Sequence, residues 1–235
     1  DETSIAIIKD GELLSNVVAT QIEMHQQFGG VMPELASRLH CENALYVLDE
    51  ALRKANITLE QVDAFAFTRG PGLIGALHIG MQVAKTLATL YHKPLIPVHH
   101  LAAHIYANEY VKPLVFPLLS IVVSGGNTEF VYMKEDMDFE IIGETKDDAI
   151  GECFDKVART VGLPYPGGIP IDRLSKEGKH TYDLPMPLHD NSLNFSYSGL
   201  KTAVINLVNN EKARGNEIRI PDLCKSFQDT AVGMV

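Results

Sequence analysis

Short apolar runs separated by turn-forming residues occupy two stretches of the chain, one at its start and one near its middle. Residues 5–8 form an apolar run that the turn Lys9-Asp10-Gly11 follows. Residues 120–142 show the same order, with a β-branched run, a glycine-rich turn, a second apolar run, a polar turn and a third run. β-branched and aromatic residues bounded by turn formers are typical of antiparallel strands. We therefore predict a hairpin over residues 1–14 and three antiparallel strands over 120–142.

The stretches between these hairpins carry helical periodicity. Pro33–Ala55 has leucines at 35, 39, 45, 48 and 52, close to the spacing that places apolar residues on one helix face. Further helices are predicted over 74–91 and 101–110, and another begins near Pro221. Short apolar strands, 62–68 and 94–98, precede two of these helices, and strand followed by helix is the order of α/β domains.

Two interpretations of this order remain open. One is an ordinary mixed α/β domain in which the two hairpins are coincidental. The other is an α/β fold built from two similar ribonuclease-H-like halves, as in actin, Hsp70 and the sugar kinases. In that fold each half opens with a hairpin that grips phosphates, and nucleotide binds in the cleft between the halves. Two prolines interrupt the pattern between 112 and 117, so the expected halves are 1–114 and 115–235.

Composition excludes several classes of protein. Hydrophobic residues make up 46% of the chain and charged residues 21%, as in soluble globular proteins. No apolar run approaches the roughly 18 residues of a membrane span, and the first residues do not resemble a signal peptide. We expect a cytoplasmic protein with no membrane partner. Three dispersed cysteines favour a reducing compartment over a disulfide framework. The formal charge of −10 argues against a broad basic surface for nucleic acid.

A histidine pair is the first candidate for chemistry. His100 and His104 are four residues apart, so on a helix they occupy one face about a turn apart. Two imidazoles at this spacing can bind one ion, and neutral imidazole suits iron, zinc or nickel. A zinc peptidase of the HExxH type needs Glu after the first His, and here that residue is Leu101. Peptide hydrolysis by that route is therefore disfavoured.

Two glycine-rich segments are candidates for binding an anion or a nucleoside. Residues 124–128, Ser-Gly-Gly-Asn-Thr, follow a β-branched run, and glycine N–H groups after a strand can hold a phosphate or carboxylate. The alternative is an ordinary hairpin turn. Residues 165–170, Tyr-Pro-Gly-Gly-Ile-Pro, precede Asp172. Asp172 could bind ribose hydroxyls, or it could cap the helix that the next residues begin.

The acidic stretch 147–158 leads into an amphipathic helix. Asp147 and Asp148 are interpreted as charges at the helix N-terminus. Asp155 lies further inside the helix and would need a partner if it faced a cleft.

Together these segments resemble the bacterial branch of the tRNA N6-threonylcarbamoyladenosine transferase family, formerly called the glycoprotease family. The matching motifs occur in the family's order over essentially the whole chain: residues 1–4, 29–38, 68–73, 99–107, 124–128, 147–156, 165–170 and 195–203. The resemblance implies a chain lacking the first strand of its first half. It also implies a second half that stops before the family's third metal ligand, an Asp.

The resemblance implies a role for each candidate. His100 and His104 would be metal ligands, for one divalent ion per subunit, Fe²⁺ or Zn²⁺. The adenylate or its threonylcarbamoyl group would lie against Val123, Ser124, Gly125, Gly126 and Asn127. Asp155, Gly168 and Asp172 fall where the family contacts the nucleoside. Asn127 stands where the family commonly has His, and Ala102 where it often has Glu.

The implied reaction transfers the threonylcarbamoyl group from threonylcarbamoyl-AMP to N6 of the tRNA adenosine next to the anticodon, assisted by the metal. No catalytic side chain is expected beyond the metal site. Implied partners are tRNA, a paralogous ribonuclease-H-like subunit (TsaB) and a small ATPase subunit (TsaE).

Two other functions remain possible on the same fold. An ATP-dependent phosphotransferase or ATPase would use the hairpins but leaves the histidine pair without a role. A non-catalytic partner subunit would have lost its metal ligands, and His100 and His104 argue against that.

Overall fold

The computed structural model describes residues 2–188 and 192–235. The chain divides into two compact units, Asp1–Tyr106 and Ala107–Val235, and each is described by itself. The expected division at 114/115 stays a prediction.

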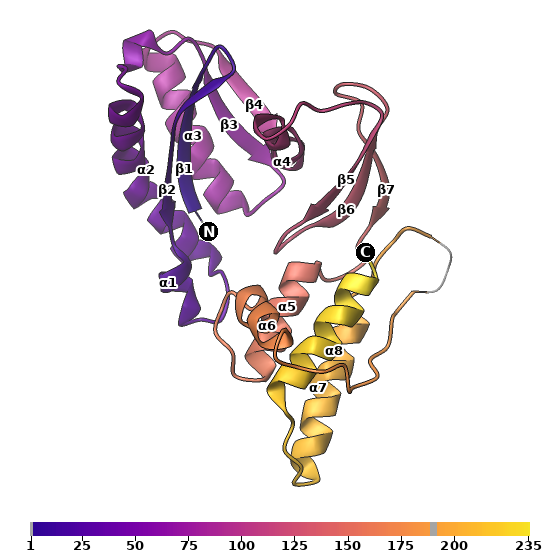
Figure 1. Ribbon diagram of the computed structural model, residues 1–235. Helices are drawn as coiled ribbons and strands as arrows, with labels where there is room; N and C mark the ends of the chain where they lie inside the picture. Colours follow the sequence, from indigo (N-terminus) through magenta and orange to yellow (C-terminus); the bar gives the residue numbers. More distant parts are fainter. Residues whose placement is uncertain (1, 189–191) are drawn as a thin grey trace. The chain divides into compact units, whose positions relative to one another are not determined.

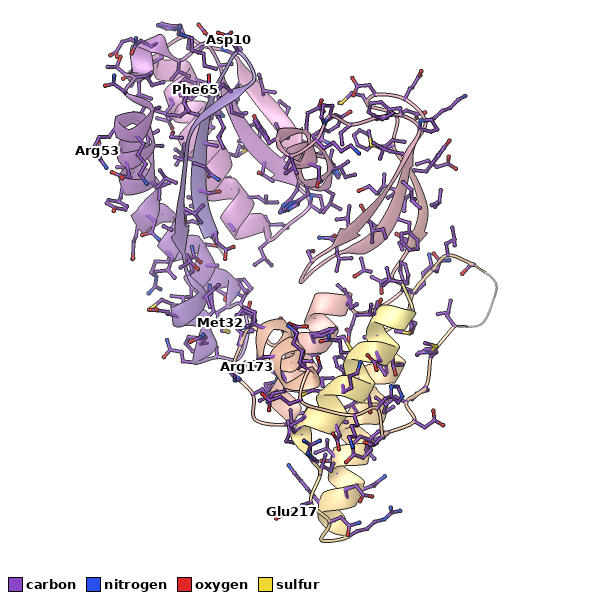
Figure 2. The ribbon with its side chains drawn as sticks, viewed as in Figure 1. Asp10, Met32, Arg53, Phe65, Arg173 and Glu217 are labelled. Atoms are coloured by element: carbon purple, nitrogen blue, oxygen red, sulfur yellow. The ribbon has the colours of Figure 1, made fainter. Side chains whose placement is uncertain are left out.

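The first unit opens with an antiparallel hairpin (Figure 1). Strand β1 (Glu2–Lys9) pairs with β2 (Glu12–Thr20), and the register shifts between Ile7 and Ile8. Asp10, labelled at the hairpin tip in Figure 2, and Gly11 both have positive φ, which a tight turn requires. The hairpin predicted over 1–14 is confirmed, and its second strand runs six residues further.

The first unit also contains a pair of parallel strands. β3 (Phe65–Gly70) and β4 (Leu95–His99) lie side by side, joined through helix α3 (Ile74–Leu90). Helix α2 (Pro33–Ala55) packs on β1, β2 and α3. It begins with Pro at a position where no N–H is needed and ends at Asn56 in the left-handed conformation. Val17, Val47 and Ala51 form the buried contact between hairpin and helix.

The remaining elements of the first unit are short. They are α1 (Ile22–Gln26), the 3₁₀ turn η1 (Leu59–Gln61) and α4 (His100–Tyr106).

The second unit contains a three-stranded antiparallel sheet in the order β5-β6-β7 (Figure 1). Its strands are β5 (Leu118–Val123), β6 (Thr128–Met133) and β7 (Glu140–Glu144), as predicted over 120–142. The helices of this unit are η2 (Ala107–Tyr110), α5 (Ile150–Thr160), α6 (Gly168–Ser175), α7 (Ser198–Ala213) and α8 (Ile220–Gly233). Arg173, on α6, and Glu217, between α7 and α8, are labelled in Figure 2.

One apolar core joins the four α-helices of the second unit. Cys153, Val157, Ile171, Leu200 and Phe227 are almost fully buried in it. Phe154 on α5 and Phe227 on α8 meet edge to face with ring centroids 4.8 Å apart. This packing fixes α5, which carries Asp155, and α6, which carries Gly168 and Asp172.

The mixed α/β class is confirmed by these elements. Among the described residues, no helix is long and apolar enough to cross a membrane.

Candidate functional site

The histidine pair lies where the parallel strands of the first unit end. β4 ends at His99, which pairs with Gly70 at the end of β3, and α4 begins at His100. The carboxyl ends of parallel strands are where α/β proteins place their ligand sites. The Nε2 atoms of His100 and His104 are 2.9 Å apart. The two imidazoles therefore converge on one point, as the four-residue spacing predicted.

The protonation of His100 is set by its surroundings. Burial, followed by the neighbouring His104, holds the pKa of His100 below its ordinary value, so the ring is neutral near pH 7. Its ring also hydrogen-bonds the carbonyl of Pro71. Because a carbonyl only accepts, the ring nitrogen that faces Pro71 carries the proton in the neutral ring.

This donor pair fits two ligand positions of a divalent ion. Nitrogens about 2.1 Å from one ion lie about 3.0 Å apart at right angles and about 3.4 Å apart in a tetrahedron. The observed 2.9 Å is close to the first value. Within residues 2–188 and 192–235, no cluster of three or more His, Cys, Asp or Glu could hold a metal. His100 and His104 thus offer two nitrogen donors at a spacing that suits one ion.

The glycine hairpin of the second unit is organised by Ser124. Its Oγ accepts hydrogen bonds from the N–H groups of Gly126 at 3.3 Å and Asn127 at 3.0 Å. The N–H groups of Gly126 and Asn127 could donate to an anion only if they released Ser124 Oγ or shared their hydrogens with it. The Ser124 carbonyl accepts from the Gly151 N–H at 3.3 Å, which attaches the hairpin to the start of α5.

Asp155 and the second glycine motif are joined directly. Oδ1 of Asp155 accepts from the Gly167 N–H at 2.6 Å, which places Gly168 and the start of α6 beside α5. Burial raises the pKa of Asp155, and the Gly167 hydrogen bond opposes this.

Asp172 lies inside α6, in its second turn, so the alternative that it caps this helix is wrong. Lys176 contacts Oδ2 at 2.7 Å and Gln228 donates to Oδ1 at 3.1 Å. Lys176 first, and Gln228 second, lower the pKa of Asp172. The carboxylate is therefore charged near pH 7 and about half exposed.

The glycines of these motifs fall into two kinds. A Cβ on Gly151 would lie 2.6 Å from the Ser124 carbonyl oxygen, and one on Gly167 would lie 2.6 Å from the Phe154 carbonyl oxygen. Close packing therefore explains these two. A Cβ on Gly125, Gly126 or Gly168 would meet no atom of the described chain within 4 Å, and none of the three has a positive φ. Neither packing nor backbone conformation requires glycine at these three positions.

Asp147 and Asp148 precede α5, whose N-cap is Ala149, but the carboxylate of Asp147 serves a different helix. Asp147 accepts hydrogen bonds from the N–H groups of Tyr197 at 2.7 Å and Ser198 at 3.1 Å, and from the hydroxyls of Ser196 and Ser198. It caps α7, fifty residues away, because α7 begins there with unpaired N–H groups. Asp148 bridges Lys156 at 3.0 Å and Lys201 at 2.6 Å.

Sequence reasoning also missed Gln228 on α8. The sequence places Gln228 in a predicted helix, but nothing in the sequence indicates that its side chain contacts α6. In the structure, Ser124 attaches the hairpin to α5 through Gly151. Asp155 attaches α5 to the start of α6 through Gly167, and Asp172 attaches α6 to α8 through Gln228.

Comparison with known proteins identifies the family. The profile of TsaD, tRNA N6-adenosine threonylcarbamoyltransferase, matches residues 12–235. The tRNA N6-adenosine threonylcarbamoyltransferase of Bacillus thuringiensis (strain Al Hakam) is 58% identical over 237 residues, covering 100% of this chain and 69% of the relative. The enzyme of that name from Staphylococcus epidermidis (strain RP62A) is 57% identical over 234 residues, 99% of this chain and 69% of the relative.

Solved structures are more distant. A crystal structure from Pseudomonas aeruginosa, described as similar to peptidase YEAZ, has a TM-score of 0.42 and 19% identity, covering 92% of this chain and 89% of that one. YeaZ from Pseudomonas aeruginosa has a TM-score of 0.41 and 20% identity over 59% of this chain and 58% of that one.

The family profile and the sequence relatives define a transferase that modifies tRNA. The chain belongs to the TsaD family, the tRNA N6-adenosine threonylcarbamoyltransferases, and its activity is the transfer of a threonylcarbamoyl group to tRNA adenosine. Membership confirms the duplicated ribonuclease-H-like fold class. It also implies a divalent metal and threonylcarbamoyl-AMP as substrate, and it disfavours the phosphotransferase and partner-subunit alternatives.

Proposed function

We propose that His100 and His104 are two ligands of the divalent ion used in this transfer. We further propose that Val123, Ser124, Gly125, Gly126 and Asn127, with Asp155, Gly168 and Asp172, bind threonylcarbamoyl-AMP. When bound, the ion would act as a Lewis acid on the carbamoyl carbonyl. The adenosine N6 attacks the carbamoyl carbon, the bond from that carbon to the phosphate oxygen breaks, N6 loses a proton and AMP leaves.

The observation that carries the proposal is the contrast between the two kinds of glycine. At Gly125, Gly126 and Gly168 a Cβ would meet no atom of the described chain within 4 Å. A ligand lying against the backbone is a physical reason to exclude a Cβ there. Asp172 lies one helical turn after Gly168, where a charged and half-exposed carboxylate can accept from ribose hydroxyls.

A cysteine nucleophile is not part of this mechanism. Burial raises the pKa of Cys153 to about 12 and that of Cys224 to about 11, so both thiols stay protonated near pH 7. Only thiolates are effective nucleophiles. Direct attack by the N6 amine on the activated carbonyl needs no covalent enzyme intermediate.

We further propose that the ion is iron, with zinc as the alternative, and that the protein works in the cytoplasm. Its proposed partners are TsaB, a paralogous subunit, and TsaE, a small ATPase. The formal charge of −10 supports a contribution by partners to tRNA binding, because an acidic chain repels phosphates.

His100→Ala in the full-length protein tests the metal role, with His78→Ala as the matched control. His78 is an exposed helical histidine that contacts Gln82 four residues later. We expect His100→Ala to lose bound metal and threonylcarbamoyl transfer while keeping its circular dichroism, because a half-buried residue contributes little packing. His78→Ala should retain both. Near-normal tRNA modification by a folded His100→Ala protein contradicts the proposal.

A further inference from the structure

Gln228 on α8 makes a single side-chain contact that reaches the proposed nucleoside site. Its Nε2 donates to Oδ1 of Asp172 on α6, at 3.1 Å. The carboxylate can only accept, so the amide must present its NH₂ group to Asp172. Oε1 of Gln228 therefore points away from Asp172.

That Oε1 atom is buried, and among the described residues it has no hydrogen-bond partner. A buried acceptor without a partner destabilises a fold, and an apolar side chain of the same size would avoid this cost. Stability of the core therefore does not account for glutamine at this position. The hydrogen bond to Asp172 is the one polar contact that the described structure gives this side chain.

The other restraint on Asp172 is weak. Lys176 contacts Oδ2 at 2.7 Å, but its side chain is 71% exposed and solvent screens the pair. Exposed ion pairs hold side chains loosely. Gln228, whose amide oxygen is buried, therefore fixes the direction of the carboxylate on its inner side.

We infer that Gln228 is a positioning residue for nucleotide binding, which holds the Asp172 carboxylate in the orientation that accepts hydrogen bonds from a ribose diol of the adenylate. This inference rests on the proposed role of Asp172. A carboxylate with one oxygen held from inside presents its free lone pairs in one fixed direction, and two adjacent hydroxyls can meet that direction together.

The test compares four full-length proteins: unchanged, Gln228→Met, Lys176→Met and Asp172→Asn. AMP and 2′,3′-dideoxy-AMP are the probes, their affinities are measured by calorimetry, and stability is measured by urea denaturation. Met matches glutamine in length and lacks polar atoms. We expect Gln228→Met to bind AMP roughly three- to tenfold more weakly and the dideoxy analogue unchanged, about the effect of one hydrogen bond. It should be at least as stable as the unchanged protein. Lys176→Met should change AMP binding by less than about twofold.

The outcomes separate two failures. Unchanged AMP affinity in Asp172→Asn contradicts the proposed role of Asp172 itself. Weakened AMP binding in Asp172→Asn with unchanged binding in Gln228→Met overturns only the role of Gln228. The role of Gln228 is also overturned if Gln228→Met is destabilised but prefers AMP over the dideoxy analogue as strongly as the unchanged protein does. Glutamine would then have a structural role. Gln228→Leu repeats the comparison should the Met variant fail to fold.

Discussion

Gly167 and Gly168 are neighbours in sequence, yet the structure predicts opposite consequences for replacing each with alanine. A Cβ on Gly167 would lie 2.6 Å from both the Ala158 Cβ and the Phe154 carbonyl oxygen, and 2.8 Å from the Asp155 Cα. Two of these three atoms are backbone, so the helices themselves must shift. Overpacking of this kind costs about 1–3 kcal/mol of unfolding free energy.

Gly168→Ala adds its methyl group to open space in the first turn of α6. Alanine restricts the unfolded chain and favours helix, so we expect unfolding free energy to stay level or rise by about 0.4–1 kcal/mol. The two variants should therefore differ by about 1–4 kcal/mol in stability, the sum of the two effects.

In Gly168→Ala, AMP affinity should fall although stability does not. The methyl group would occupy the space assigned to the nucleotide, so we expect AMP affinity to fall by at least about tenfold, or about 1.4 kcal/mol. Urea denaturation followed by circular dichroism gives the stabilities, and calorimetry with AMP gives the affinities. Gly168→Ala being as unstable as Gly167→Ala, or binding AMP normally, would refute the distinction between packed and open glycines.

Three further predictions concern Asp147, the cysteines and His25. Asp147→Ala should lower unfolding free energy by about 1–3 kcal/mol at pH 7, measured by urea denaturation, because a helix cap and its hydrogen bonds are lost. Burial opposes ionisation of Asp147, but its hydrogen bonds outweigh burial and lower its pKa. Its contribution should be present above the unfolded pKa of about 3.9 and should disappear as pH falls through the lower folded pKa, so the variant and the unchanged protein converge in acid. Iodoacetamide at pH 8 followed by mass spectrometry should modify exposed Cys41 and spare Cys153 and Cys224 until urea is added. Burial lowers the pKa of His25, whose Nδ1 accepts a backbone N–H, so stability should fall as pH drops below about 6.5, and less steeply in His25→Gln. Labelling of Cys153 in the folded protein would contradict the cysteine prediction. Equal loss of stability in acid with and without Asp147 would contradict the first prediction, and an unchanged dependence of stability on pH in His25→Gln would contradict the third.

Local sequence predicted the elements whose signals are local. Pro33–Ala55 is helical over the predicted range because its leucine spacing, its first-turn proline and its left-handed Asn56 agree. The strand predicted over 62–68 begins three residues later, at Phe65, because Leu59–Gln61 forms a 3₁₀ turn with a Thr58 capping box. The helix predicted over 101–110 changes after Tyr106 into a 3₁₀ turn.

In the candidate site, too, the sequence predicted local contacts and missed those between distant residues. His100 and His104 lie on one helix, so their spacing alone predicted that their rings converge. The contacts of Asp147 with Ser198 and of Asp172 with Gln228 join residues 51 and 56 positions apart. No periodicity indicates such contacts, because they depend on how separate helices pack.

The cap that Asp147 forms on α7 has a consequence for the order of assembly. The loop that it closes to Ser198 spans 51 residues, and the length-dependent part of the closure entropy is about 3.5 kcal/mol at 25 °C. During synthesis, however, the cap leaves the ribosome before the helix that it serves. Each new N–H group at the start of α7 therefore emerges into a chain whose acceptor is already made. The second unit can close this 51-residue loop as soon as α7 appears, without waiting for α8.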